Sequence, residues 1–168
     1  MLDGKYMGMP GIDKIGGNRP AEDFYKVVSS SANNWDKTYV MSETYGDMGN
    51  ISIESMYNIA IEQYTKGINQ LIPHAVWYNN ADVWFLPELS YRNPLYNYQL
   101  ADFNKFLSRL NYMLARTGRH VSDVAMMYPI NTLQAGHYFD GPEGFYKGGV
   151  NIPDVDYSMV SRLSLIHI

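Results

Sequence analysis

The stretch KTYVMSETYG, residues 37–46, places a carboxylate directly after a short apolar run. Residues 38–41 are mostly apolar or β-branched, a composition that predicts a short buried strand. A strand normally ends in a plain turn, whereas this one is followed by Ser42 and Glu43. A buried carboxylate costs free energy unless it is paired or used in chemistry. Glu43 is therefore either a solvated or helix-capping carboxylate or a functional group at a strand end.

Helical and strand patterns alternate around this stretch. Apolar residues recur at helical spacing in residues 21–34, in residues 53–64 and in residues 97–117. Ser52 is a typical helix N-cap, and Gly67 is a typical helix end. Apolar runs at residues 70–72 and 121–128 predict two further strands, and residues 1–20, rich in glycine and proline, predict a loop.

The order helix, strand, helix, strand, helix, strand predicts an α/β fold with parallel strands and crossover helices. The strands are continuous apolar runs, as expected when both faces of a sheet are covered. About three such β/α units match part of a (β/α)8 TIM-type barrel, in which the loops after the strands form the catalytic face. Glu43 and His74 follow successive strands. We therefore expect them at one rim of the sheet, with the long loop at residues 75–96.

The bulk composition narrows the function classes. The 168 residues match about one domain, and 13 basic against 17 acidic residues with no basic stripe argue against a nucleic-acid partner. No apolar run is long enough to span a membrane, and the N-terminus has no signal-peptide pattern. Cysteine is absent, which excludes disulfides and thiolate metal sites. The 15 Tyr and 3 Trp suit either a carbohydrate ligand or an aromatic-rich core.

Several phrases in order resemble glycoside hydrolase family 106, the large bacterial enzymes typified by α-L-rhamnosidases. They are PGID, VVSSSANNW, VMSETYG, GINQLIPHAVWY, PELSYRNPLY, RLNYMLARTGRHVSDVAMMYPI and PDVDY. The resemblance extends to about Arg162 and implies a catalytic barrel within a longer multidomain protein. Residues 1–120 would be the C-terminal part of the barrel, and residues 121–162 the start of an amidotransferase-like α/β domain. The loop NNADVWFLPELSYRNP departs from the family pattern, which leaves the substrate open.

The resemblance also implies site residues. Glu43 would be a catalytic carboxylate, and His74 would line the sugar subsite. Glycoside hydrolysis needs two carboxyl groups, one to donate a proton and one to activate water or attack the sugar. Glu43 follows an apolar strand and lies beside Tyr45, so we expect it to be the donor. Glu88 is the best second candidate in the chain, and its alternative is a loop carboxylate that holds a turn. Further residues with either sugar-binding or packing roles are His74, Tyr45, Trp77, Tyr78 and Trp84.

The expected function is cleavage of terminal sugars, α-L-rhamnose among them, from plant or polysaccharide glycosides. The alternatives are a non-catalytic carbohydrate-binding relative and a structural domain. The sequence requires no cofactor, and the resemblance is compatible with a calcium ion in the parent protein, for which it names no ligands. We read His120 and His137 as surface or structural residues, and Asp154 and Asp156 as helix caps. A periplasmic or extracellular location would suit the parent protein, whose native N-terminus we expect to lie upstream.

The last residues, LSLIHI at 163–168, are unusual. A helix that begins near Asp156 would continue through them, yet they match the translation of CTG TCT CTT ATA CAC ATC. That string resembles a transposon-end adaptor used in sequencing libraries. We therefore expect residues 163–168 to be non-native and the chain to be an internal fragment that does not hydrolyse glycosides alone. The alternative is a natural apolar C-terminal turn.

Overall fold

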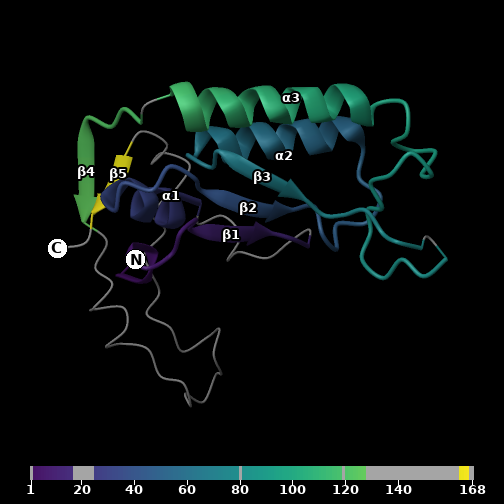
Figure 1. Cartoon of the computed structure of the whole chain (residues 1–168), viewed down its shortest axis with the longest axis horizontal. Coiled ribbons are helices and arrows are strands. Elements are labelled where there is room, and N and C mark those ends of the chain that lie inside the picture. Colours follow the sequence, from purple (N-terminus) through teal and green to yellow (C-terminus); the bar gives the residue numbers. More distant parts are fainter. Residues whose placement is uncertain (1, 17–24, 80, 119, 128–162, 167–168) are drawn as a thin grey trace, which may run out of the picture.

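A three-stranded parallel sheet lies at the centre of the molecule, in a computed structural model that describes residues 2–16, 25–79, 81–118, 120–127 and 163–166. Its strands are β1 (Gly11–Lys14), β2 (Met41–Thr44) and β3 (Gln70–Pro73), and β2 is the middle strand. Gly11 pairs with Met41, which pairs with Gln70. The three arrowheads therefore point to the same end of the sheet (Figure 1).

Helices connect these strands, and the predicted α/β alternation is confirmed. They are α1 (Tyr25–Asn34), α2 (Ile53–Thr65) and α3 (Leu100–Tyr112), with a short 3-10 helix η1 (Leu2–Lys5) before β1 and a π-helical turn η3 (Met113–Thr117) after α3. Helices α2 and α3 lie side by side across one face of the sheet (Figure 1). The core forms where they meet the sheet, around Met56, Leu71 and Phe103.

Local chemistry explains the helix ends and the helix packing. The hydroxyl of Ser52 accepts a hydrogen bond from the backbone N–H of Ser55 at 3.1 Å, which confirms the predicted N-cap of α2. Gly67 has φ +97°, a conformation that favours glycine, just beyond the end of α2. The apolar face predicted for α3 is buried through Phe103 and Leu107, and the ring of Phe103 meets the ring of Tyr57 edge-on.

Two strand predictions need correction. The strand predicted at residues 38–41 lies at Met41–Thr44, so Glu43 is inside β2 rather than beyond it. This shift is possible because the buried Thr44 hydroxyl is hydrogen-bonded to the Gln63 amide of α2, at 3.1 Å, which offsets the cost of burying polar groups. Residues 1–20 were expected to be a loop, but they contain β1 and η1.

A second, two-stranded parallel sheet pairs β4 (Val124–Met127) with β5 (Leu163–Ile166). Strand β4 confirms the third predicted strand. The helix expected to continue through residues 163–166 is wrong, because these residues are extended in β5. The adaptor origin of residues 163–168 and the domain boundary near residue 120 stay predictions. His137, Asp154 and Asp156 lie outside the described residues.

Candidate functional site

The two faces of the sheet carry different side chains. Along β2, Ser42 and Thr44 are buried on the side of α2, so Glu43 points to the opposite side because side chains alternate along a strand. The strand register places Glu43 between Asp13 of β1 and Ile72 of β3. Residues in register on parallel strands share a face. Asp13, Glu43 and Ile72 therefore form a row on the face away from α2, and both Asp13 and Ile72 are exposed.

Glu43 and His74 lie at one end of the sheet, as predicted, and the structure also brings their side chains next to each other. Glu43 Oε1 is 3.6 Å from His74 Nδ1, and the side chains are 46% and 19% exposed respectively. This distance is longer than a hydrogen bond and within the range of a weak ion pair. Glu43 is more exposed than the apolar setting expected for a proton donor.

The ring of His74 is positioned by Phe85, Trp77 and Gly46. Its Nε2 lies 3.1 Å from the carbonyl oxygen of Phe85. A carbonyl oxygen only accepts, so this contact assigns a hydrogen to Nε2. The ring meets Trp77 edge-on, with centroids 5.9 Å apart. A Cβ at Gly46 would lie 3.2 Å from His74 Cγ, so the missing side chain at Gly46 leaves room for the imidazole.

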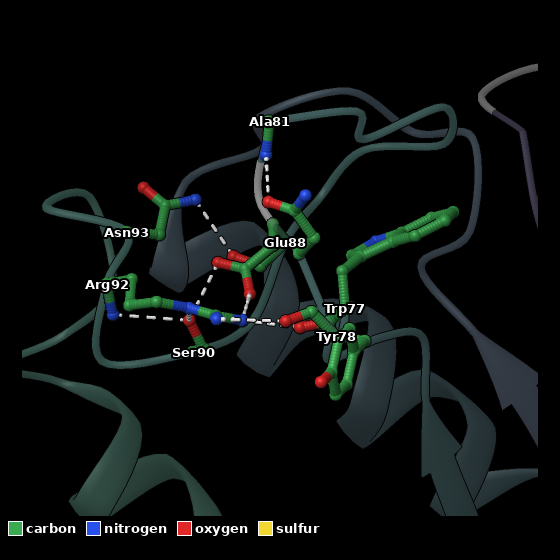
Figure 2. A network of polar contacts seen from close by, with 8 residues as sticks. Trp77, Tyr78, Ala81, Glu88, Ser90, Arg92 and Asn93 are labelled. Carbon is green, nitrogen blue, oxygen red and sulfur yellow. Dashed lines mark hydrogen bonds and ion pairs between the residues drawn. The ribbon is translucent and has the colours of Figure 1, made fainter.

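Glu88 is a structural carboxylate in the 75–96 loop (Figure 2). Its side chain is 5% exposed, Oε2 accepts a hydrogen bond from the Ser90 hydroxyl at 2.9 Å, and Oε1 lies 3.3 Å from Arg92 Nη2. Arg92 also donates to the backbone carbonyls of Trp77 and Tyr78. The Asn93 amide donates to the Glu88 carbonyl at 2.8 Å. The alternative that Glu88 holds a turn fits this geometry, because both of its carboxylate oxygens already have partners.

The aromatic residues of the loop differ in exposure. Trp77 packs against His74, and no described residue accepts a hydrogen bond from its buried indole N–H. Tyr78 is fully exposed, Trp84 is 80% exposed, and Tyr91 is also exposed. The loop thus presents flat apolar rings to solvent at the end of the sheet where Glu43 and His74 lie.

Tyr45 belongs to the core and does not join the other candidates. Its side chain is fully buried, its hydroxyl donates to the backbone carbonyl of Met56 at 2.8 Å, and its ring lies against Phe103. Burial raises the pKa of Tyr45 well above the ordinary value of a tyrosine. A ligand would not reach this ring, so the expected substrate contact of Tyr45 is not supported.

The sequence analysis did not find Asp13 or Arg92. Asp13 was missed because β1 has only four residues and follows Pro10 within a glycine-rich segment. The run GIDK does not by itself indicate a site, because Asp13 gains its neighbour Glu43 only through the register of β1 with β2. Arg92 had no usable signal in the sequence. It follows Glu88 by four residues, but that spacing brings side chains together in a helix and these residues are in a loop.

Metal ligands and membrane spans were also sought in the described part of the chain. No three His, Asp or Glu side chains there gather in a way that could hold a metal ion. The calcium ion of the parent protein stays an expectation. None of the described helices combines the length and the apolar character that crossing a membrane requires.

Comparisons with known proteins found no matching family model, no matching curated protein and no matching solved structure.

Proposed function

We propose that this chain is part of a glycoside hydrolase, with β1, β2 and β3 as successive strands of its catalytic (β/α)8 barrel. The observation that carries the proposal is the contact of Glu43 with His74 on the face of the sheet away from α2. In a barrel the helices cover the outside, and the catalytic groups lie at the carboxyl ends of the strands. Glu43 is the third of the four residues of β2, and His74 directly follows β3.

Glu43 acts as the proton donor in this proposal. Its carboxyl group gives a proton to the glycosidic oxygen as the bond to the anomeric carbon breaks, and it becomes a carboxylate. His74 positions Glu43 through Nδ1, while the Phe85 carbonyl fixes the orientation of the imidazole ring. Glu43 is less buried than a proton donor in an apolar setting would be, and its exposure lets the group reach a substrate that enters from solvent.

Asp13 replaces Glu88 as our candidate for the second carboxyl group. Adjacent strands lie about 4.8 Å apart, so the in-register Asp13 and Glu43 are close enough to act on one sugar ring. Asp13 is exposed, whereas both oxygens of Glu88 are held by Ser90 and Arg92. Asp13 would activate water or attack the anomeric carbon.

The substrate class follows from the loop. Exposed aromatic rings stack on the apolar faces of sugars, and Tyr78, Trp84 and Tyr91 present such rings near the sheet end. The substrate would be the terminal sugar of a plant or polysaccharide glycoside, with α-L-rhamnose as the first sugar to test. The amidotransferase-like domain beginning at residue 121 is part of the same proposal.

The test uses the longer hydrolase that we propose contains this sequence. Glu43→Gln should lower turnover of a glycoside with a poor leaving group by about 10²–10⁴-fold, because a positioned proton donor contributes that much. Asp13→Asn should also lower turnover by orders of magnitude. Glu62→Gln is the matched control, because Glu62 lies near the end of α2, is paired with Lys66 and should not affect turnover when changed. Near-normal turnover of the Glu43 variant would overturn the proposal.

A non-catalytic carbohydrate-binding role is the second candidate, favoured by the exposed rings of the 75–96 loop. The same protein distinguishes the two roles. Sugar binding that weakens in Trp84→Ala, together with no hydrolysis by the unmodified protein, would establish the binding role and exclude the catalytic one.

A further inference from the structure

A cavity of about 480 Å³ lies at the opposite end of the sheet from Glu43 and His74. Its wall includes Val40 and Asn69, which precede β2 and β3, and Gly67, which follows α2. The Asn69 side chain orders this wall, because its oxygen accepts from the N–H of Val40 and its amide donates to the carbonyl of Thr38, both at 2.8 Å. The volume is within the range of small-molecule pockets, about 300–1,000 Å³.

The charged groups of the cavity wall all carry or can carry positive charge. They are Lys26, Lys37 and His120, and no Asp or Glu is among the described residues that line the cavity. The ammonium groups of Lys26 and Lys37 have no hydrogen bond or ion pair with a side chain in the described part of the chain. The nearby Lys66 shows the usual arrangement, because its ammonium is 2.7 Å from Glu62 Oε1.

Lys26 is the unusual member of this group. It is only 3% exposed, although lysine is almost never fully buried unless it is paired. Burial lowers the pKa of Lys26. Burial, and then the charge of Lys26, lowers the pKa of His120, so the two cationic groups lie close enough to repel each other. Lys26 lines the cavity beside a second cationic group, so an anion in the cavity would be stabilised by both charges.

We propose that this cavity binds a small organic anion whose phosphate group is held by Lys26, with Lys37 and His120 at its edge. An oxyanion would supply the acceptors that the ammonium of Lys26 lacks among the described side chains. The cavity is larger than a bare phosphate needs, and Leu114 and Val121 give part of its wall an apolar surface. This inference uses different residues from the proposed hydrolase site and does not depend on it.

The test is calorimetric titration of the 168-residue chain with inorganic phosphate and with phenyl phosphate, at constant ionic strength. Both should bind, and phenyl phosphate should bind more tightly because its ring meets the apolar wall. Lys26→Met should weaken both by about tenfold or more, since a hydrogen bond to a charged group is lost. The matched control is Lys105→Met, which removes an exposed lysine paired with Asp102 and should bind as the unmodified chain does.

A second readout separates binding from a purely structural role of Lys26. Without anion, Lys26→Met should melt at the same or a higher temperature, because it removes an uncompensated buried charge. Phosphate should then raise the melting temperature of the unmodified chain and not that of the variant. If Lys26→Met does not fold, Lys37→Met should show a smaller loss of affinity. Absence of phosphate binding, or equal binding by unmodified chain and variants, would overturn the proposal.

Discussion

Glu43 on strand β2 and Glu88 in the 75–96 loop are the same residue type in opposite environments. Glu43 is 46% exposed, and the weak contact with His74 is the one ion pair that the described residues give it. Glu88 is buried, and both of its oxygens are used within the loop. The difference teaches that burial with complete hydrogen bonding marks a carboxylate that holds structure. A carboxylate that reacts with a ligand must keep an oxygen free.

The largest stability effect should come from Glu88. Glu88→Gln leaves the partly buried guanidinium of Arg92 without its counter-charge, and we expect a loss of about 1–3 kcal/mol in the free energy of unfolding. Glu43→Gln should change it by less than about 1 kcal/mol, because its ion pair is exposed and weak. Urea unfolding of the two variants measures both values. The reverse order would break the comparison between the two glutamates.

Tyr45 should give the next effect. Tyr45→Phe removes the hydrogen bond to the Met56 carbonyl and should cost about 1 kcal/mol in the free energy of unfolding. It should not change turnover of the proposed hydrolase, because the ring is in the core. Lost turnover with normal stability would show that Tyr45 contributes to the functional site.

The buried tyrosines also predict a pH dependence. Burial raises the pKa of Tyr45 and of Tyr64, so the unfolded chain releases these protons first, near pH 10. Their contribution to stability is complete below about pH 10 and decreases as the pH rises above it. The alkaline decrease should be shallower in Tyr45→Phe than in the unmodified chain. Equal slopes in unfolding experiments from pH 9 to 11 would contradict this assignment.

His74 should have the smallest effect on stability. His74→Gln should change the free energy of unfolding by no more than about 1 kcal/mol, because the contact with Glu43 is long and the Glu43 side chain is half exposed. In the proposed hydrolase it should lower turnover of a glycoside with a poor leaving group, because His74 positions Glu43 through Nδ1. Unchanged turnover would show that the contact has no role in catalysis.

Patterns within single segments could be predicted from the sequence. The caps of α2, the apolar face of α3 and the position of β3 each depend on neighbouring residues. The exact span of β2 could not be predicted, because it depends on Thr44 meeting Gln63, a residue nineteen positions later. Strand β1 has only four residues, and their pattern is weaker than the loop signal of the adjacent glycines and Pro10.

The candidate site was predicted in part for the same reason. The rule that parallel strands end at one edge correctly placed Glu43 and His74 at the same end of the sheet. It could not reveal that Tyr45 turns into the core or that Glu88 pairs with Arg92, because those outcomes depend on side-chain packing. Asp13 emerged only from the register of β1 with β2.

The most direct test of the account is the leaving-group dependence of Glu43→Gln in the proposed hydrolase. A general acid assists a poor leaving group strongly and an activated one weakly, because only the former needs a proton as it departs. We predict a loss of about 10²–10⁴-fold in turnover of an alkyl glycoside and a much smaller loss for a dinitrophenyl glycoside. Equal losses on both substrates, or no loss on either, would contradict the assignment of Glu43 as the proton donor.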